Sequence, residues 1–140
     1  MKNLYEIFDE FENAGSKKER MAVIENNLSR VLVEVLELTF HPNYQWLIKE
    51  MPHNYTFPET PKGMGYMQLS TEIRKFYLFR AGDPAAERLT TRRRTEILLQ
   101  LLESLEPREA EVVMGIFRKD LGVPGLDYNF VKEAFPALLP

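Results

Sequence analysis

The sequence predicts an all-α protein that folds as a single compact domain, residues 1–140, with about six to seven helices. Apolar residues make up 44% of the 140 residues, which is enough to bury a core without disulfide bonds or metal ions. Several segments repeat apolar residues at the three- and four-residue spacing of one helix face. No internal repeat or low-complexity tract divides the chain.

The first third of the chain predicts three helices. The first covers residues 2–13, and a buried face at helical spacing indicates it. Ser16 and Glu19 have the Ser-x-x-Glu spacing of a capping box, which predicts the start of a second helix over about 17–26. Residues 28–40 are apolar nearly all round, so we expect the most buried helix there. The buried face of the first helix consists of Leu4, Ile7, Phe8 and Phe11.

The middle of the chain is less regular. Residues 44–49 are short and aromatic, which favours an extended segment, and the Pro- and Gly-rich residues 51–66 predict one long loop. Helical spacing returns over about 70–79 and, after a Gly-Asp-Pro break, over about 86–104. Pro107 suits the first turn of a further helix.

Composition excludes several classes of function. The chain has no cysteine, which removes disulfides and thiolate chemistry and favours a reducing compartment such as a cytoplasm. The two histidines, His41 and His53, lack zinc-site spacing, so we expect no metal and no cofactor. The N-terminus has no apolar run that could form a signal peptide or a membrane span. No nucleophile elbow, Walker loop or dinucleotide fingerprint occurs, so we expect no enzyme.

Charge is distributed unevenly along the chain. The net charge is −3, yet residues 68–100 carry +3 (seven Lys and Arg against four Asp and Glu), whereas residues 41–67 are neutral (2 − 2) and residues 101–140 carry −3 (4 − 7). The densest positive feature is the run Arg92, Arg93 and Arg94. Consecutive residues of a helix point about 100° apart, so these three side chains cannot all face one partner. Arg92 and Arg93 are therefore candidates for phosphate contact, and a solvated, salt-bridged helix start is the equally weighted alternative.

The last third of the chain holds a second candidate site. A helix ending in Arg118 and Lys119 is followed by a glycine turn at Gly125, and an Asp-started helix then carries Asn129 and Lys132. This arrangement can present backbone N–H groups and positive charge to a phosphate. It can equally be an ordinary joint between two helices.

Two stretches resemble the N-terminal helical DNA-binding domain of phage ATP-dependent DNA ligases. The first is Leu38-Thr-Phe-His-Pro-Asn-Tyr-Gln-Trp-Leu-Ile-Lys-Glu-Met-Pro52, and the second runs from Arg118-Lys-Asp-Leu to Phe135-Pro-Ala-Leu-Leu-Pro140. Over its whole length the chain also resembles a family of small T-even-type phage proteins of unknown function. The ligase resemblance implies backbone contacts to duplex DNA, made by Arg118, Lys119, Gly125, Asn129 and Lys132.

The chain departs from the ligase pattern in three ways. The spacing from Asp120 to Gly125 is about one residue longer than in the ligases, and Glu133 adds a negative charge beside Lys132. No Lys-x-Asp-Gly nucleotidyltransferase motif occurs, so the resemblance carries no ligase activity. A shared fold does not by itself carry a function.

These observations lead to two functional hypotheses. The first is a nonenzymatic phage accessory protein in the host cell cytoplasm that binds the backbone of duplex DNA without sequence preference. The alternative is a module that docks on a phage or host protein and binds no nucleic acid. Its candidate anchors are apolar residues of the long loop, which can pack against a partner. These anchors are Tyr55, Phe57, Met64 and Tyr66.

Overall fold

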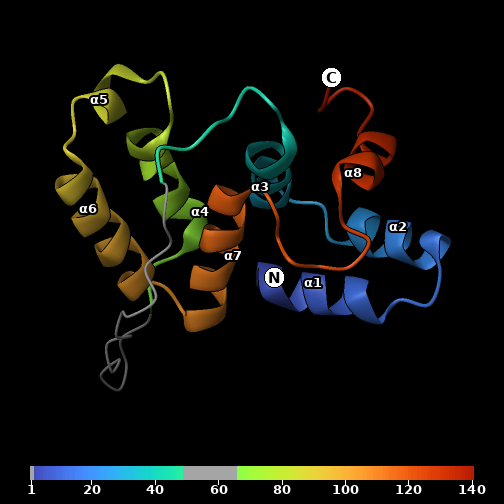
Figure 1. The fold of residues 1–140 in the computed structure, drawn as a ribbon. Helices are drawn as coiled ribbons and strands as arrows, with labels where there is room; N and C mark the ends of the chain where they lie inside the picture. The colour runs from blue at the N-terminus through green and yellow to red at the C-terminus, as the bar shows by residue number, and fades with distance from the viewer. Residues whose placement is uncertain (1, 49–65) are drawn as a thin grey trace. The chain divides into compact units, whose positions relative to one another are not determined.

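A computed structural model describes residues 2–48 and 66–140, and these residues form eight α-helices and one 3-10 helix (Figure 1). The expected all-α class is confirmed. The chain divides into two compact units. Unit 1 consists of Met1–Asn43 and Gly115–Pro140, and unit 2 consists of Tyr44–Met114. The expectation of one domain over residues 1–140 stays a prediction.

Unit 1 combines helices from the first and last parts of the chain. The helix at residues 2–13 is confirmed, with its ends at Leu4 and Asn13, and the capping box works as expected. Ser16 Oγ accepts a hydrogen bond from the Glu19 N–H at 3.2 Å, and the Glu19 carboxylate accepts one from the Gly15 N–H at 2.7 Å. The helices are α1 (Leu4–Asn13), α2 (Lys17–Asn26), α3 (Arg30–Phe40), the end of α7 (Pro107–Arg118) and α8 (Tyr128–Ala134).

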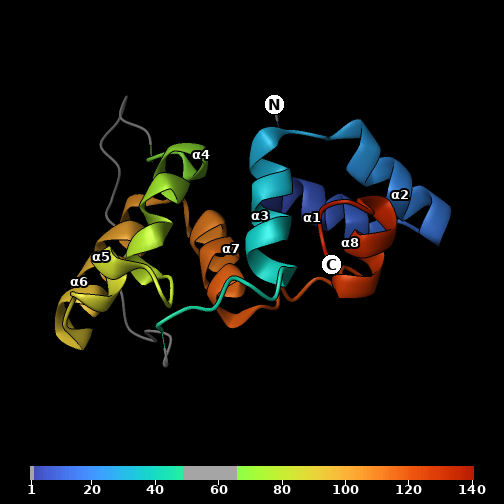
Figure 2. The ribbon, with the colours of Figure 1, turned by 90° about the horizontal axis from the view of Figure 1, so that it is seen from above.

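The core of unit 1 joins α1 to the last helix. Phe11 is fully buried, and its ring meets the edge of the Phe130 ring with the centroids 4.9 Å apart. Helix α8 also packs against α3, and the two helices lie side by side in both views (Figure 2). The amphipathic face predicted for residues 2–13 is therefore buried, as its spacing indicated.

Unit 2 is contiguous in sequence. Its extended segment appears as one antiparallel bridge between Trp46 and Arg80, with hydrogen bonds from the Leu47 N–H to the Phe79 carbonyl and from the Ala81 N–H to the Gln45 carbonyl. The helical elements follow this segment. They are α4 (Leu69–Glu72), the 3-10 helix η1 (Ile73–Phe79), α5 (Pro84–Glu87), α6 (Thr91–Ser104) and the first part of α7.

Two of the expected helices in unit 2 differ from the structure. The helix expected over 70–79 becomes a 3-10 helix from Ile73 onward, because its buried residues recur every three positions, the repeat of a 3-10 helix. These residues are Ile73, Phe76 and Phe79.

The single helix expected over 86–104 is wrong, since α5 ends at Glu87 and α6 begins at Thr91. Each part has its own N-cap. The Asp83 carboxylate accepts from the Ala85 N–H at 2.9 Å, and Thr90 Oγ1 accepts from the Arg93 N–H at 3.0 Å. An N-cap residue is extended rather than helical, so Thr90 interrupts the helix. The two differences raise the helix number above the expected six to seven.

Most of the predicted loop at 51–66 lies outside the described residues, and only Tyr66 falls within them. Across 2–48 and 66–140, none of the helices has both the length and the apolar character needed to cross a bilayer.

Candidate nucleic-acid interface

The turn between α7 and α8 is shaped by residues with positive φ. Helix α7 ends in a Schellman arrangement, with the Asp120 N–H donating to the Gly115 carbonyl at 3.0 Å and the Lys119 N–H donating to the Ile116 carbonyl at 3.1 Å. Lys119 takes the left-handed conformation, φ 63°, that glycine usually supplies at this position. Gly115 permits the fold-back, because a Cβ there would lie 3.0 Å from the Leu121 Cα.

The two candidate lysines of this turn bind main-chain carbonyls. Lys119 Nζ donates to the carbonyl of His41, the C-cap of α3, at 2.7 Å. Its positive charge therefore lies at the negative end of the helix dipole. Burial lowers the pKa of the Lys119 ammonium below its ordinary value of 10.5. Lys132 Nζ donates to the Leu139 carbonyl at 3.0 Å. Both ammonium groups thus hold parts of unit 1 together.

Gly125 lies directly against a guanidinium group. Its φ is 82°, and a Cβ on it would lie 2.7 Å from Nη1 of Arg20 and 3.7 Å from the Phe11 ring. The Arg20 Cζ lies 5.6 Å from the centroid of the same ring, within the range of a cation–π contact. Arg20 could not be assigned to this turn from the sequence, because Arg20 and Gly125 come from opposite parts of the chain. Glycine at position 125 is what allows this close approach.

Gly125 and Lys132 of the predicted set are exposed, and so are Arg118 and Asn129. Within the described residues, neither the Arg118 nor the Asn129 side chain has an ion pair or a hydrogen bond. Glu133, which the sequence placed beside Lys132 as an opposing charge, forms an ion pair with Lys17 at 2.5 Å. The negative charge of Glu133 is therefore balanced from α2.

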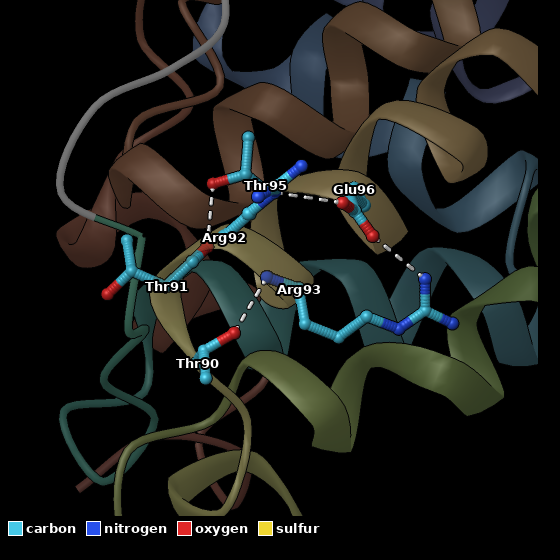
Figure 3. A network of polar contacts seen from close by, with 6 residues as sticks. All are labelled: Thr90, Thr91, Arg92, Arg93, Thr95 and Glu96. Atoms are coloured by element: carbon cyan, nitrogen blue, oxygen red, sulfur yellow. Dashed lines mark hydrogen bonds and ion pairs between the residues drawn. The ribbon is translucent and has the colours of Figure 1, made fainter.

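The other candidate site lies at the start of α6, where two arginines share one carboxylate (Figure 3). The Arg93 guanidinium lies 3.1 Å from Oε2 of Glu96, and Nε of Arg92 lies 3.5 Å from Oε1. Both pairs face solvent, and the Arg92 side chain is 92% exposed. The predicted fanning of the triplet is confirmed, because Arg94 turns away and donates to the carbonyls of Ala86 and Leu89 at 2.9 and 3.1 Å.

The segment of unit 2 from Ile73 to Arg94 has an excess of positive charge. Its two acidic residues hold backbone N–H groups, Asp83 that of Ala85 and Glu87 that of Gly82 at 3.0 Å. Arg74 and Arg88 are exposed and form no ion pair with any described residue. The basic residues of the segment are Arg74, Lys75, Arg80, Arg88, Arg92, Arg93 and Arg94.

Of the residues named for protein docking, Tyr55, Phe57 and Met64 lie outside the described residues, and Tyr66 is 38% exposed. Unit 1 instead has an open apolar groove of about 570 Å³ between the start of α3 and the end of α8. Leu28, which is 55% exposed, lies in this groove together with Val33 and Phe135.

Within 2–48 and 66–140, no group of three or more His, Asp and Glu side chains is arranged to hold a metal ion. No curated protein matches the chain. The family match covers residues 7–123, which begin within α1, include α2 to α7 and end before Gly125 and α8. The chain belongs to the family described as "Family of unknown function (DUF6433)".

Proposed function

We propose that this protein is a nonenzymatic phage accessory protein that binds the phosphate backbone of duplex DNA without sequence preference. The observation that carries the proposal is the start of α6, where Arg92 and Arg93 share the single carboxylate of Glu96. One carboxylate cannot neutralise two guanidinium groups, so a positive charge remains in excess at this exposed position.

The ion pairs of Arg92 and Arg93 with Glu96 are weak enough for a phosphate to replace the carboxylate. An exposed ion pair contributes only about 0–1 kcal/mol, so little is lost when a guanidinium exchanges its carboxylate partner for a phosphate. A guanidinium also binds two phosphate oxygens at once, which strengthens the contact. Arg88 and Arg74 add unpaired positive charge in the same segment. The two acidic residues of that segment, Asp83 and Glu87, offset only part of the charge of its seven basic residues, so positive charge remains in excess.

The turn between α7 and α8 contributes fewer DNA contacts in this proposal than the ligase resemblance implies. Arg118 and Asn129 are exposed and are the side chains that we propose to contact phosphates there. Lys119 and Lys132 already bind carbonyls, and Gly125 contacts Arg20. In this proposal these three residues support the turn rather than touch DNA.

The double substitution Arg92→Ala/Arg93→Ala is expected to weaken duplex binding and its dependence on salt. Each lost phosphate contact lowers the slope of log K against log salt by about one. Two lost contacts lower it by about two. The measurement is fluorescence anisotropy of a labelled duplex at several salt concentrations. Arg108→Ala is the control, because it removes one positive charge, half of the charge that the double variant loses, from the acidic half of unit 2.

Equal slopes for the wild type and the double variant would remove the start of α6 from the interface. No duplex binding by the wild type at low salt would overturn the proposed function altogether. If Arg108→Ala reduced log K by half as much as the double variant does, only the total charge would matter, and the proposed contact at the start of α6 would be overturned.

The groove of unit 1 favours one second candidate, a protein-docking function. An amphipathic helix of a phage or host protein can fill an apolar groove with its apolar face. Leu28 exposes more than half of its surface there, beside Val33 and Phe135. If this is the function, a pull-down from infected cells recovers a stoichiometric partner with the wild type and loses it with Leu28→Asp. Recovery of the same partner with Leu28→Asp would exclude the groove.

A further inference from the structure

The 3-10 helix η1 places Arg74 and Tyr77 in one exposed row. Residues three positions apart eclipse each other in a 3-10 helix, and a rise of about 2 Å per residue separates them by about 6 Å along the axis. The neighbouring row faces the core. Tyr77 is 50% exposed, whereas the other aromatic residues of η1, Phe76 and Phe79, are buried. Arg80 is the first residue after η1 and lies three positions beyond Tyr77, so it continues the three-residue spacing of this row.

Arg80 connects this row to two further rings. Its Cζ lies 4.3 Å from the centroid of the Tyr44 ring, and the Tyr44 and Trp46 rings are stacked, 6.1 Å apart and 19° from parallel. The bridge between Trp46 and Arg80 fixes the extended segment beside the end of η1. One guanidinium group and two stacked rings therefore lie beside the end of η1.

We propose that this part of unit 2 binds single-stranded nucleic acid, with an unpaired base stacked on the Tyr77 ring and a flanking phosphate held by Arg74. The site consists of Tyr77 and Arg74, with Arg80, Tyr44 and Trp46 beside the end of η1. Aromatic rings that stack successive bases, combined with arginines that follow the backbone, are the features by which proteins bind single strands without sequence preference.

The charges around the row suit this ligand. Arg74 forms no ion pair with any described residue, and its charge is available to a phosphate. The closest acidic residue in sequence, Glu72, is buried and paired with Lys75 at 2.7 Å. Asp83 caps α5. An acidic or apolar protein partner would not use the Tyr77 ring to stack a base. The experiment must therefore distinguish a nucleic-acid ligand from a protein ligand.

The test is binding of labelled oligothymidylate to the full chain, measured by fluorescence anisotropy at low salt. Tyr77→Ala is expected to reduce the affinity roughly five- to hundred-fold, because it removes one stacked base. Tyr77→Phe keeps the ring and is expected to restore binding. Tyr5→Ala, which removes a tyrosine of unit 1, is the control that changes nothing. Far-ultraviolet circular dichroism of each variant confirms the helical fold.

Equal binding by the wild type, Tyr77→Ala and Tyr77→Phe would overturn the stacking site, as would the absence of oligothymidylate binding. If the wild type bound a protein through Tyr77 but did not bind oligothymidylate, the site would be a protein-binding site and the proposal would be overturned. The site involves none of the α6 residues proposed for duplex binding. A loss of duplex binding in Arg92→Ala/Arg93→Ala, with the Tyr77 effect retained, would therefore separate the two proposals.

Discussion

Replacing Phe11 by alanine is expected to lower the free energy of unfolding by about 3–5 kcal/mol, the cost of removing a buried phenylalanine and leaving a cavity. Phe11 is fully buried, its ring meets the edge of Phe130, and the Arg20 guanidinium lies over its face. One substitution therefore removes core packing, an aromatic pair and a cation–π contact. Urea denaturation followed by circular dichroism measures the loss.

Two controls make this expectation specific. Phe11→Leu keeps most of the apolar volume and is expected to cost less than Phe11→Ala, although it still loses both ring contacts. Tyr77→Ala removes an aromatic ring that is half exposed and is expected to change the stability little. A Phe11→Ala protein that unfolds at the wild-type urea midpoint would contradict the packing of α1 on α8.

Gly125→Ala is expected to lower the free energy of unfolding by about 1–3 kcal/mol, less than Phe11→Ala does. An alanine in the left-handed region costs about 1–2 kcal/mol. At this position its Cβ must also displace Arg20 Nη1, which lies 2.7 Å away. The same denaturation experiment measures the loss.

Gly122→Ala is the matched control for Gly125→Ala. Gly122 has a similar φ, 72° against 82°, but a Cβ there meets nothing within 4 Å. The difference between the two alanine variants therefore isolates the contact with Arg20 from backbone strain. In an Arg20→Ala background that difference should shrink toward zero. A difference that persists without Arg20 would assign the cost to another neighbour.

The sequence was sufficient for elements whose signals are local. The capping box at Ser16 and Glu19 and the apolar face of α1 need only residues a few positions apart, and both are confirmed. The split between α5 and α6 also had a local signal, since Thr90 is a favourable N-cap residue. The apolar spacing that runs across it suggested one continuous helix.

The contacts of the candidate site could not be predicted from the sequence, because they join residues that lie far apart in the chain. Lys119 binds the carbonyl of His41, and Gly125 contacts Arg20, so neither partner can be read from neighbouring residues. The spreading of Arg92, Arg93 and Arg94 around the helix axis was predictable, because it follows from helix geometry alone. The carbonyl partners of Arg94 depended on where α5 ends and α6 begins.

The composition of unit 1 has a consequence for the order of events during synthesis. Unit 2 is one continuous stretch, Tyr44–Met114, whereas unit 1 joins Met1–Asn43 to Gly115–Pro140. On the ribosome, Phe11 leaves the exit tunnel long before Phe130 exists, so the Phe11 ring lacks its aromatic partner until α8 has been made. Closing so long a loop slows folding. The part of the α1 face that packs against Phe130 therefore stays uncovered in the nascent chain throughout the synthesis of unit 2.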